Sequence, residues 1–304
     1  MQTVPALGRL RAVIVVLAAA ALSAPASAAE PDPSPWHQPV PPFRSLLTRP
    51  DEPSTSDWAD VRLTARSIGR RLIHPTRRDV LTYAGLVLGA VYLERAKFDL
   101  AGDAQGQRNE ETDEMSARVR PLGEAVVPLM ALSTYFIGKF SGSQSTRQAG
   151  LILSESAGFT VLATEIGQFM LSEQRPEAGG KVSFFRGGGH GVSGHTSIIA
   201  SVAIPLDRMF FTVHPDDNGW TRVAKYFGKT VVYAAPVATG WSRLNDNKHY
   251  AWNVLLGLGT GFMVGEFVSS AHGLDGKDDG DRSWSVVPIT DDHGAPGLAF
   301  RWTR

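Results

Sequence analysis

Cysteine is the residue type that this chain of 304 residues lacks completely. Its absence excludes disulfide bonds, a thiol nucleophile and thiolate metal sites. An excess of charge of one sign is missing as well, because 30 lysine and arginine residues balance 30 aspartate and glutamate residues. Without a basic surplus, nothing in the composition indicates a nucleic-acid partner.

The body of the chain also lacks long stretches that are both apolar and uncharged. The apolar, uncharged runs contain 13 to 16 residues, and they are 80–93, 125–138, 230–242 and 250–265. A helix that crosses a bilayer needs about 20 apolar residues. We therefore expect helices that are buried in a globular core, and a polytopic membrane protein is the alternative.

The first 28 residues have the pattern of a secretory signal peptide. Two arginines precede an apolar run from residue 12 to residue 22, and small residues follow at 26–28. We expect an exported protein that lies in the periplasm or cell envelope after cleavage, and an uncleaved N-terminal anchor is the alternative. Residues 29–56 contain eight prolines, which predicts a proline-rich linker or arm.

Helical periodicity extends over residues 57–272, which we expect to form one helical domain. Residues 273–304 begin as an acidic, glycine-rich loop and continue as two short strands, 284–289 and 297–302. The predicted fold is therefore all-α, a compact helical bundle with a short C-terminal β-hairpin. The candidate helices are 57–72, 78–97, 109–140 with a bend near Pro121 or Pro128, 144–173, 195–213, 221–240 and 247–270.

Three segments carry side chains that suit phosphate chemistry: QFMLSEQRP (168–176), GGGHGVSGHTS (187–197) and SRLNDNKHYAWN (242–253). Their two arginines can bind phosphate oxygens bidentately and keep their charge at any working pH. The glycine-rich loop runs into a helix, and the exposed N–H groups at such a junction bind anions. One imidazole can attack phosphorus while another protonates the leaving alkoxide.

In their order and spacing, these segments resemble the signature motifs of the type 2 phosphatidic acid phosphatase superfamily. That superfamily also holds bacterial acid phosphatases and vanadium haloperoxidases, and its motifs are K-x6-R-P, P-S-G-H and S-R-x5-H-x3-D. The matching residues are Arg175 and Pro176 in the first motif, Ser193, Gly194 and His195 in the second, and Ser242, Arg243 and His249 in the third. The resemblance implies a bundle of the phosphatidic acid phosphatase/haloperoxidase type with a pocket at one end.

The resemblance also implies a role for each matching residue. His249 would be the nucleophile that forms a phosphohistidine, and His195 would protonate the leaving group. No metal or other cofactor is implied. The expected partner is a phosphorylated small molecule or a lipid phosphate. Peripheral membrane contact is compatible with either substrate. The motifs do not define an oligomeric state. The implied phosphate-binding residues are Gln168, Arg175, Ser193, Gly194 and Arg243.

Three positions depart from these motifs. Gln168 stands where the superfamily has lysine, Val192 stands in place of proline, and Asn253 stands in place of aspartate. Gln168 can still donate a hydrogen bond to phosphate, without the positive charge. Asn253 follows His249 by four residues, so on one helix it would contact the imidazole, without the charge that stabilises an imidazolium-like state. His190 in the glycine-rich loop is expected to be solvated.

Three functions follow from this pattern. The leading hypothesis is an exported, metal-independent phosphatase that acts on phosphomonoesters or lipid phosphates. The first alternative is a catalytically weakened member that binds a phosphorylated ligand, in which restoring lysine and aspartate should raise the rate. The second alternative is a vanadium-dependent haloperoxidase, in which the same pocket would hold vanadate.

Overall fold

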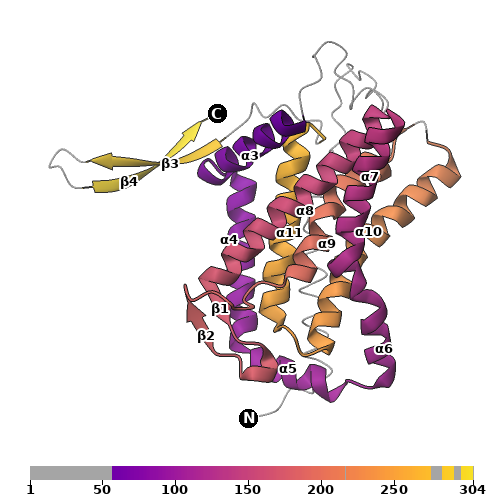
Figure 1. The fold of residues 1–304 in the computed structure, drawn as a ribbon. Coiled ribbons are helices and arrows are strands. Elements are labelled where there is room, and N and C mark those ends of the chain that lie inside the picture. The colour runs from indigo at the N-terminus through magenta and orange to yellow at the C-terminus, as the bar shows by residue number, and fades with distance from the viewer. Residues whose placement is uncertain (1–56, 216, 275–282, 291–295, 304) are drawn as a thin grey trace.

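The structure is a computed structural model that describes residues 57–215, 217–274, 283–290 and 296–303. The predicted signal peptide, the proline-rich segment and most of the acidic loop lie outside the described residues. The described part is mainly helical and ends in an antiparallel hairpin. The predicted all-α bundle with a C-terminal hairpin is therefore confirmed (Figure 1).

The helices follow one another with short connections. A π-helical turn, η1 (Leu122–Val126), lies between α6 and α7 and corresponds to the bend predicted near Pro121. A second one, η3 (Asp207–Phe211), extends α9. The α-helices are α3 (Asp57–Ile73), α4 (Arg77–Arg95), α5 (Lys97–Gly106), α6 (Glu110–Val119), α7 (Val127–Ser141), α8 (Gln144–Met170), α9 (Gly194–Leu206), α10 (Gly219–Asn245) and α11 (Ala251–Ala271).

Two pairs of strands complete the described structure. β3 (Ser283–Thr290) and β4 (Pro296–Thr303) form the C-terminal hairpin. β1 (Leu171–Glu173) and β2 (Val182–Phe184) pair antiparallel directly after α8, with the 3₁₀ turn η2 (Pro176–Ala178) between them. The sequence did not predict β1 and β2, because strands of three residues are too short to show an alternating pattern.

Two helix boundaries differ from the prediction in a way that affects the site. α10 continues to Asn245 instead of ending near residue 240, because Gly240 packs closely against Val254 and does not terminate the helix. α11 begins at Ala251 instead of residue 247, with Tyr250 as its N-cap. His249 therefore lies in the loop before α11.

The direction of the long helices brings the motif segments together. α4, α8 and α10 run toward one end of the bundle, where α7, α9 and α11 begin, while α3 lies across the opposite end (Figure 1). We call these two ends the site end and the α3 end. The loops after α8 and after α10 both lie at the site end, so segments about 80 residues apart in sequence become neighbours.

Glycines on α11 fix its approach to α9. A Cβ atom at Gly257 would lie 2.6 Å from the Ser193 carbonyl oxygen, and one at Gly261 would lie 2.2 Å from that of Ser197. Real side chains do not tolerate such distances, so these two positions require glycine. The two backbones pack in direct contact, which places the first turn of α9 beside the start of α11.

The outward faces of the bundle are unusually apolar. Exposed large side chains follow α4, α7, α8 and α10, and they include Leu88, which is 71% exposed, Phe140 at 82% and Phe227 at 70%. Three helical segments, Glu110–Ser141, Gln144–Met170 and Ala251–Ala271, are long and apolar enough to cross a membrane. The expectation that the apolar helices are buried in a globular core is therefore wrong for these outward faces.

Candidate active site

The glycine-rich loop ends at the first turn of α9, which is open to an anion. Ser193 is the N-cap, yet its hydroxyl group does not cap the helix and lies 2.9 Å from the Thr196 hydroxyl group. The first backbone bond of the turn runs from Ser197 N–H to Ser193 O at 3.0 Å. The N–H groups of residues 194–196 thus have no acceptor within the helix, and the helix dipole adds positive potential there.

Arg243 extends from the last turn of α10 and is only 5% exposed. Its Nη1 lies 3.5 Å from Asp246 Oδ2, and the other oxygen of that carboxylate accepts a bond of 2.6 Å from Ser116. Within the described residues, the buried Nε of Arg243 has no hydrogen-bond partner. Burial lowers the pKa of Arg243, and the charges of Arg120 and Arg175 act in the same direction, which indicates that three guanidinium groups lie near one another.

Arg175 follows α8 and β1 and lies at the start of the turn η2. Its only ion pair among the described residues is a long one, 3.8 Å from Nη1 to Glu177 Oε1, and its buried Nε has no partner among them either. Two arginines from separate segments therefore both retain a buried, unused N–H group. This is the arrangement that a doubly charged oxyanion would satisfy.

His249 is 7% exposed and lies in the loop between α10 and α11. Its Nδ1 is 3.2 Å from the His190 carbonyl oxygen. Because a carbonyl oxygen can only accept a hydrogen bond, Nδ1 carries the hydrogen and Nε2 keeps its lone pair. Burial, and then the charge of Arg243, lowers the pKa of His249 to about 3, so the ring is neutral at neutral pH.

His195 lies in the first turn of α9 and contacts a carboxylate that the motifs do not include. Its Nε2 is 2.9 Å from Oε1 of Glu124, in the π-helical turn η1. Burial lowers the pKa of His195, and the contact with Glu124 opposes that effect. A carboxylate hydrogen-bonded to a histidine stabilises its protonated form, which suits a proton donor.

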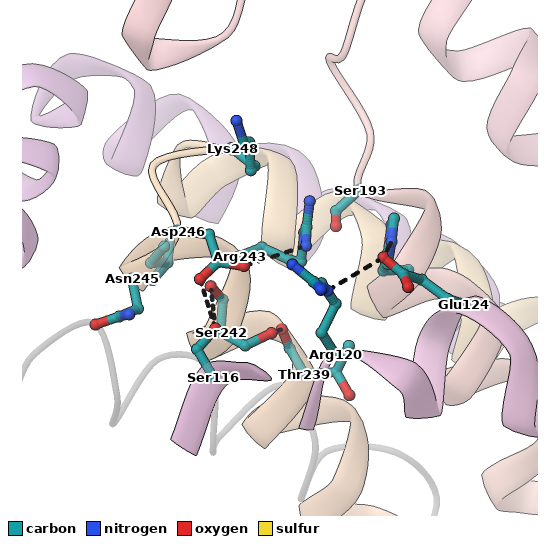
Figure 2. Close-up of polar contacts among 12 residues, drawn as sticks. Ser116, Arg120, Glu124, Ser193, Thr239, Ser242, Arg243, Asn245, Asp246 and Lys248 are labelled. Carbon is teal, nitrogen blue, oxygen red and sulfur yellow. Dashed lines mark hydrogen bonds and ion pairs between the residues drawn. The ribbon is translucent and has the colours of Figure 1, made fainter. Parts of the chain in front are cut away.

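Glu124 and Arg120 are site residues that the sequence analysis did not find. Arg120 lies just after α6, and its Nε is 3.5 Å from Glu124 Oε1. Figure 2 shows Arg120, Glu124, Arg243 and Ser193 pointing toward one another from four different segments. The only sequence signal near them was the bend at Pro121, and such π-helical turns often occur at functional sites.

The structure corrects the predicted contact of Asn253. Asn253 does not orient the His249 ring, because the Nδ1 of His249 is bonded to the His190 carbonyl. Its own amide is engaged elsewhere: Oδ1 accepts from Tyr250 N–H at 2.8 Å, and Nδ2 donates to Glu173 Oε2 at 2.8 Å. The predicted contact assumed one continuous helix, whereas the helix begins only after His249.

Gln168 and His190 also differ from expectation. Gln168 Nε2 donates to the Val192 carbonyl at 2.8 Å, so the structure gives it the role of holding the glycine-rich loop, and a direct phosphate contact remains a prediction. His190 is not simply a solvated residue. Its carbonyl binds His249, and the two ring centroids lie 6.2 Å apart.

Two further features bear on ligands. Within the described residues, no group of three or more histidine, aspartate or glutamate side chains could hold a metal ion. A cavity of about 10 Å³ beside His249 is lined by α5 and the start of α11 and includes neither arginine, so it is not the anion site. The charged groups at the site end, and not this cavity, define where a phosphate would bind.

A helical bundle in which two arginines with unused Nε–H groups, two histidines and an open helix start converge at one end defines a phosphate-binding protein of the phosphoryl-transfer class. The comparison with protein families agrees with this class. The family model described as PAP2 superfamily matches residues 149–275, which include all three motif segments. This match supports membership of the type 2 phosphatidic acid phosphatase superfamily. Members of that superfamily are generally phosphatases that act on phosphorylated substrates such as lipid phosphates. No curated protein and no solved structure matches the chain.

Proposed function

We propose that the protein is a metal-independent phosphatase that hydrolyses phosphomonoesters through a phosphohistidine at His249. One observation carries the proposal: Arg175 and Arg243 each keep a buried Nε–H group that no described residue accepts. A buried N–H group without an acceptor is unfavourable. A phosphate group supplies both the negative charge and the acceptor oxygens that these two groups require.

The resting state of His249 suits nucleophilic attack. Its Nε2 lone pair would form the N–P bond while the P–O bond to the leaving group breaks. The guanidinium groups and the N–H groups at the start of α9 would stabilise the charge on the three remaining phosphate oxygens. The His190 carbonyl would stabilise the positive charge that develops on the imidazole, because it accepts the Nδ1 hydrogen.

His195 would complete both halves of the reaction. In the first half it gives its proton to the leaving alkoxide, with Glu124 stabilising the protonated ring beforehand. In the second half it takes a proton from the water that attacks the phosphohistidine. That step breaks the N–P bond, releases inorganic phosphate and regenerates neutral His249.

A lipid phosphate is the substrate class that we favour. Exposed apolar side chains lie along α4, α7, α8 and α10, which are long helices of the same bundle that carries the charged site end. If these faces contact a bilayer, the anion site lies at the level of lipid headgroups. We also propose export, with the signal peptide and the periplasmic or cell-envelope location as predictions from the sequence.

Phosphate release by the purified protein in detergent, without added metal and with a metal chelator present, tests the proposal. We expect release from a lipid phosphate, inhibition by vanadate, and a loss of at least about 10⁴-fold in His249→Ala. His74→Ala is the matched control, because His74 is exposed at the α3 end. Equal activity in His249→Ala and His74→Ala would contradict the mechanism, and a preference for water-soluble esters would contradict the lipid substrate.

A further inference from the structure

The residue that departs most from the superfamily motif, Asn253, belongs to a buried network at the base of the site. Asn253 is 1% exposed, and its neighbour Glu173 in β1 is also 1% exposed. Glu173 Oε1 accepts 2.9 Å from Lys97 Nζ, and the same ammonium group donates to the Gly180 carbonyl at 3.1 Å. The Glu173 carboxylate is thus bonded on one side to a cation and on the other to the Asn253 amide.

The partners of Asn253 fix which atom of its amide points where. Oδ1 receives the Tyr250 N–H, which can only donate. Nδ2 faces Glu173 Oε2 at 2.8 Å and the Gly191 carbonyl at 3.1 Å, which can only accept from it. The position therefore requires one acceptor and two donor hydrogens, a combination that an amide supplies and a carboxylate does not.

Both residues hold the loop that orients the nucleophile. The His190 N–H donates to the main-chain carbonyl of Glu173 at 2.8 Å, and the Ser193 N–H donates to the main-chain carbonyl of Asn253 at 3.1 Å. The Asn253 side chain adds the bond from Nδ2 to the Gly191 carbonyl. The loop lies directly on β1, since a Cβ at Gly189 would be 2.1 Å from the Ser172 Cα atom. Between these anchors, the His190 carbonyl is aimed at Nδ1 of His249.

We propose that Glu173 and Asn253 are positioning residues: together they hold the His190 carbonyl where it accepts the Nδ1 hydrogen of His249, which leaves Nε2 free to attack phosphorus. The inference rests on the proposed function for its effect on rate. The group that orients the His249 ring is then the His190 carbonyl, which Glu173 and Asn253 hold in place. Asn253 does not contact the ring directly. The inference also reverses the expectation that restoring aspartate would improve the enzyme.

Asn253→Asp is the decisive substitution. It would place a carboxylate oxygen against Glu173 Oε2 and the Gly191 carbonyl oxygen. These three oxygen atoms would repel one another, because none of them carries a hydrogen to donate. We expect kcat to fall about 10- to 100-fold, with a smaller change in KM. Because two adjacent carboxylates share a proton at low pH, the activity of Asn253→Asp relative to wild type should rise as the pH falls from 7 to 5. A merely structural defect would not show this pH dependence.

A swapped pair provides the rescue. In Glu173→Gln/Asn253→Asp, the amide introduced in β1 can donate to the new carboxylate while its oxygen accepts from Lys97, so much of the lost activity should return. Asn218→Asp is the matched control, since Asn218 caps α10 at an exposed position through an oxygen that aspartate also has. A swapped pair no more active than Asn253→Asp, or an Asn253→Asp protein as active as wild type, would overturn the inference.

A second measurement separates this inference from the proposed function. Nitrogen-15 spectra of histidine-labelled protein, compared with His249→Gln for assignment, report which ring nitrogen of His249 carries the hydrogen. Wild type should show the Nδ1–H form, Asn253→Asp a mixture, and the swapped pair the Nδ1–H form again. If wild type releases no phosphate, the proposed function fails, while these spectra still decide the inference. If Asn253→Asp does not fold, the swapped pair decides the inference. It must fold, and its His249 ring must carry the hydrogen on Nδ1; any other result overturns the inference.

Discussion

The two ends of the bundle both bury charged side chains, but they pair them differently. At the α3 end, Arg71 binds Asp79 through two bonds of 3.1 Å, and Arg208 lies 2.7 Å from Glu266. At the site end, Arg243 and Arg175 lie 3.5 and 3.8 Å from their nearest carboxylates. Among the described residues, each keeps an Nε–H without an acceptor; Arg208 Nη1 also lacks one, but its guanidinium group has the short ion pair with Glu266. Short bidentate pairs are typical of charges that hold structure, whereas buried cations with loose partners are typical of an anion site.

The strongest way to break this comparison is to remove one arginine from each end. In Arg243→Ala we expect kcat/KM to fall about 10²- to 10³-fold, because one donor to the phosphate oxygens is lost. Stability should change little, since the substitution also relieves repulsion from Arg120 and Arg175. In Arg208→Ala we expect unfolding to become easier by about 2–4 kcal/mol, because Glu266 loses its closest ion-pair partner, with unchanged activity per folded molecule.

Phosphate-release kinetics and thermal melting on the same two variants check this prediction. The pattern of effects matters more than either value. If Arg208→Ala lost activity while folded, or Arg243→Ala lost stability while keeping full activity, the division between a structural end and a ligand-binding end would be wrong.

Sequence alone predicted residues that lie near one another in the structure, because the signal is concentrated in short motifs. Arg175, His195, Arg243 and His249 come from three segments, and the structure brings all three to one end of the bundle, where Arg243 affects the pKa of both histidines. The spacing of the residues within each motif is the signal that predicts these four side chains. The roles of these residues in turnover remain predictions until kinetics test them.

Other features could not be found in the same way. Glu124 lies outside the motifs and reaches His195 only because η1 packs against the start of α9. The contact of Asn253 depended on where α11 begins, and a boundary error of four residues moved His249 off the helix. The exposed apolar faces were missed because run lengths count charges on every face of a helix: Glu155 interrupts α8 in sequence but is buried against His272.

A smaller effect sharpens the comparison within the site itself. Glu124→Gln keeps a side chain of the same shape beside His195 but removes the charge that favours the protonated ring. We expect kcat to fall about tenfold for an alkyl phosphate, whose leaving group needs a proton. For p-nitrophenyl phosphate, whose leaving group needs little protonation, the fall should be much smaller.

Glu114→Gln is the matched control for that substitution, because Glu114 forms an exposed ion pair with Arg118 in α6, in the same part of the bundle. Steady-state rates on the two substrates give the ratio directly. Equal losses on both substrates would show that Glu124 supports the fold of η1 and not the proton transfer.

The last prediction concerns pH and stability. Burial holds the pKa of His249 at about 3, against an ordinary value of 6.5, so in this interval the unfolded chain binds the proton that the folded chain refuses. Stability from this group is therefore complete above pH 6.5 and declines as the pH falls toward 3, with a slope of at most about 1.4 kcal/mol per pH unit. His249→Gln should flatten the decline in denaturant unfolding between pH 6.5 and 4, while His74→Gln should keep it. Identical slopes in the two variants would show that folding does not lower the pKa of the His249 ring, which contradicts this prediction.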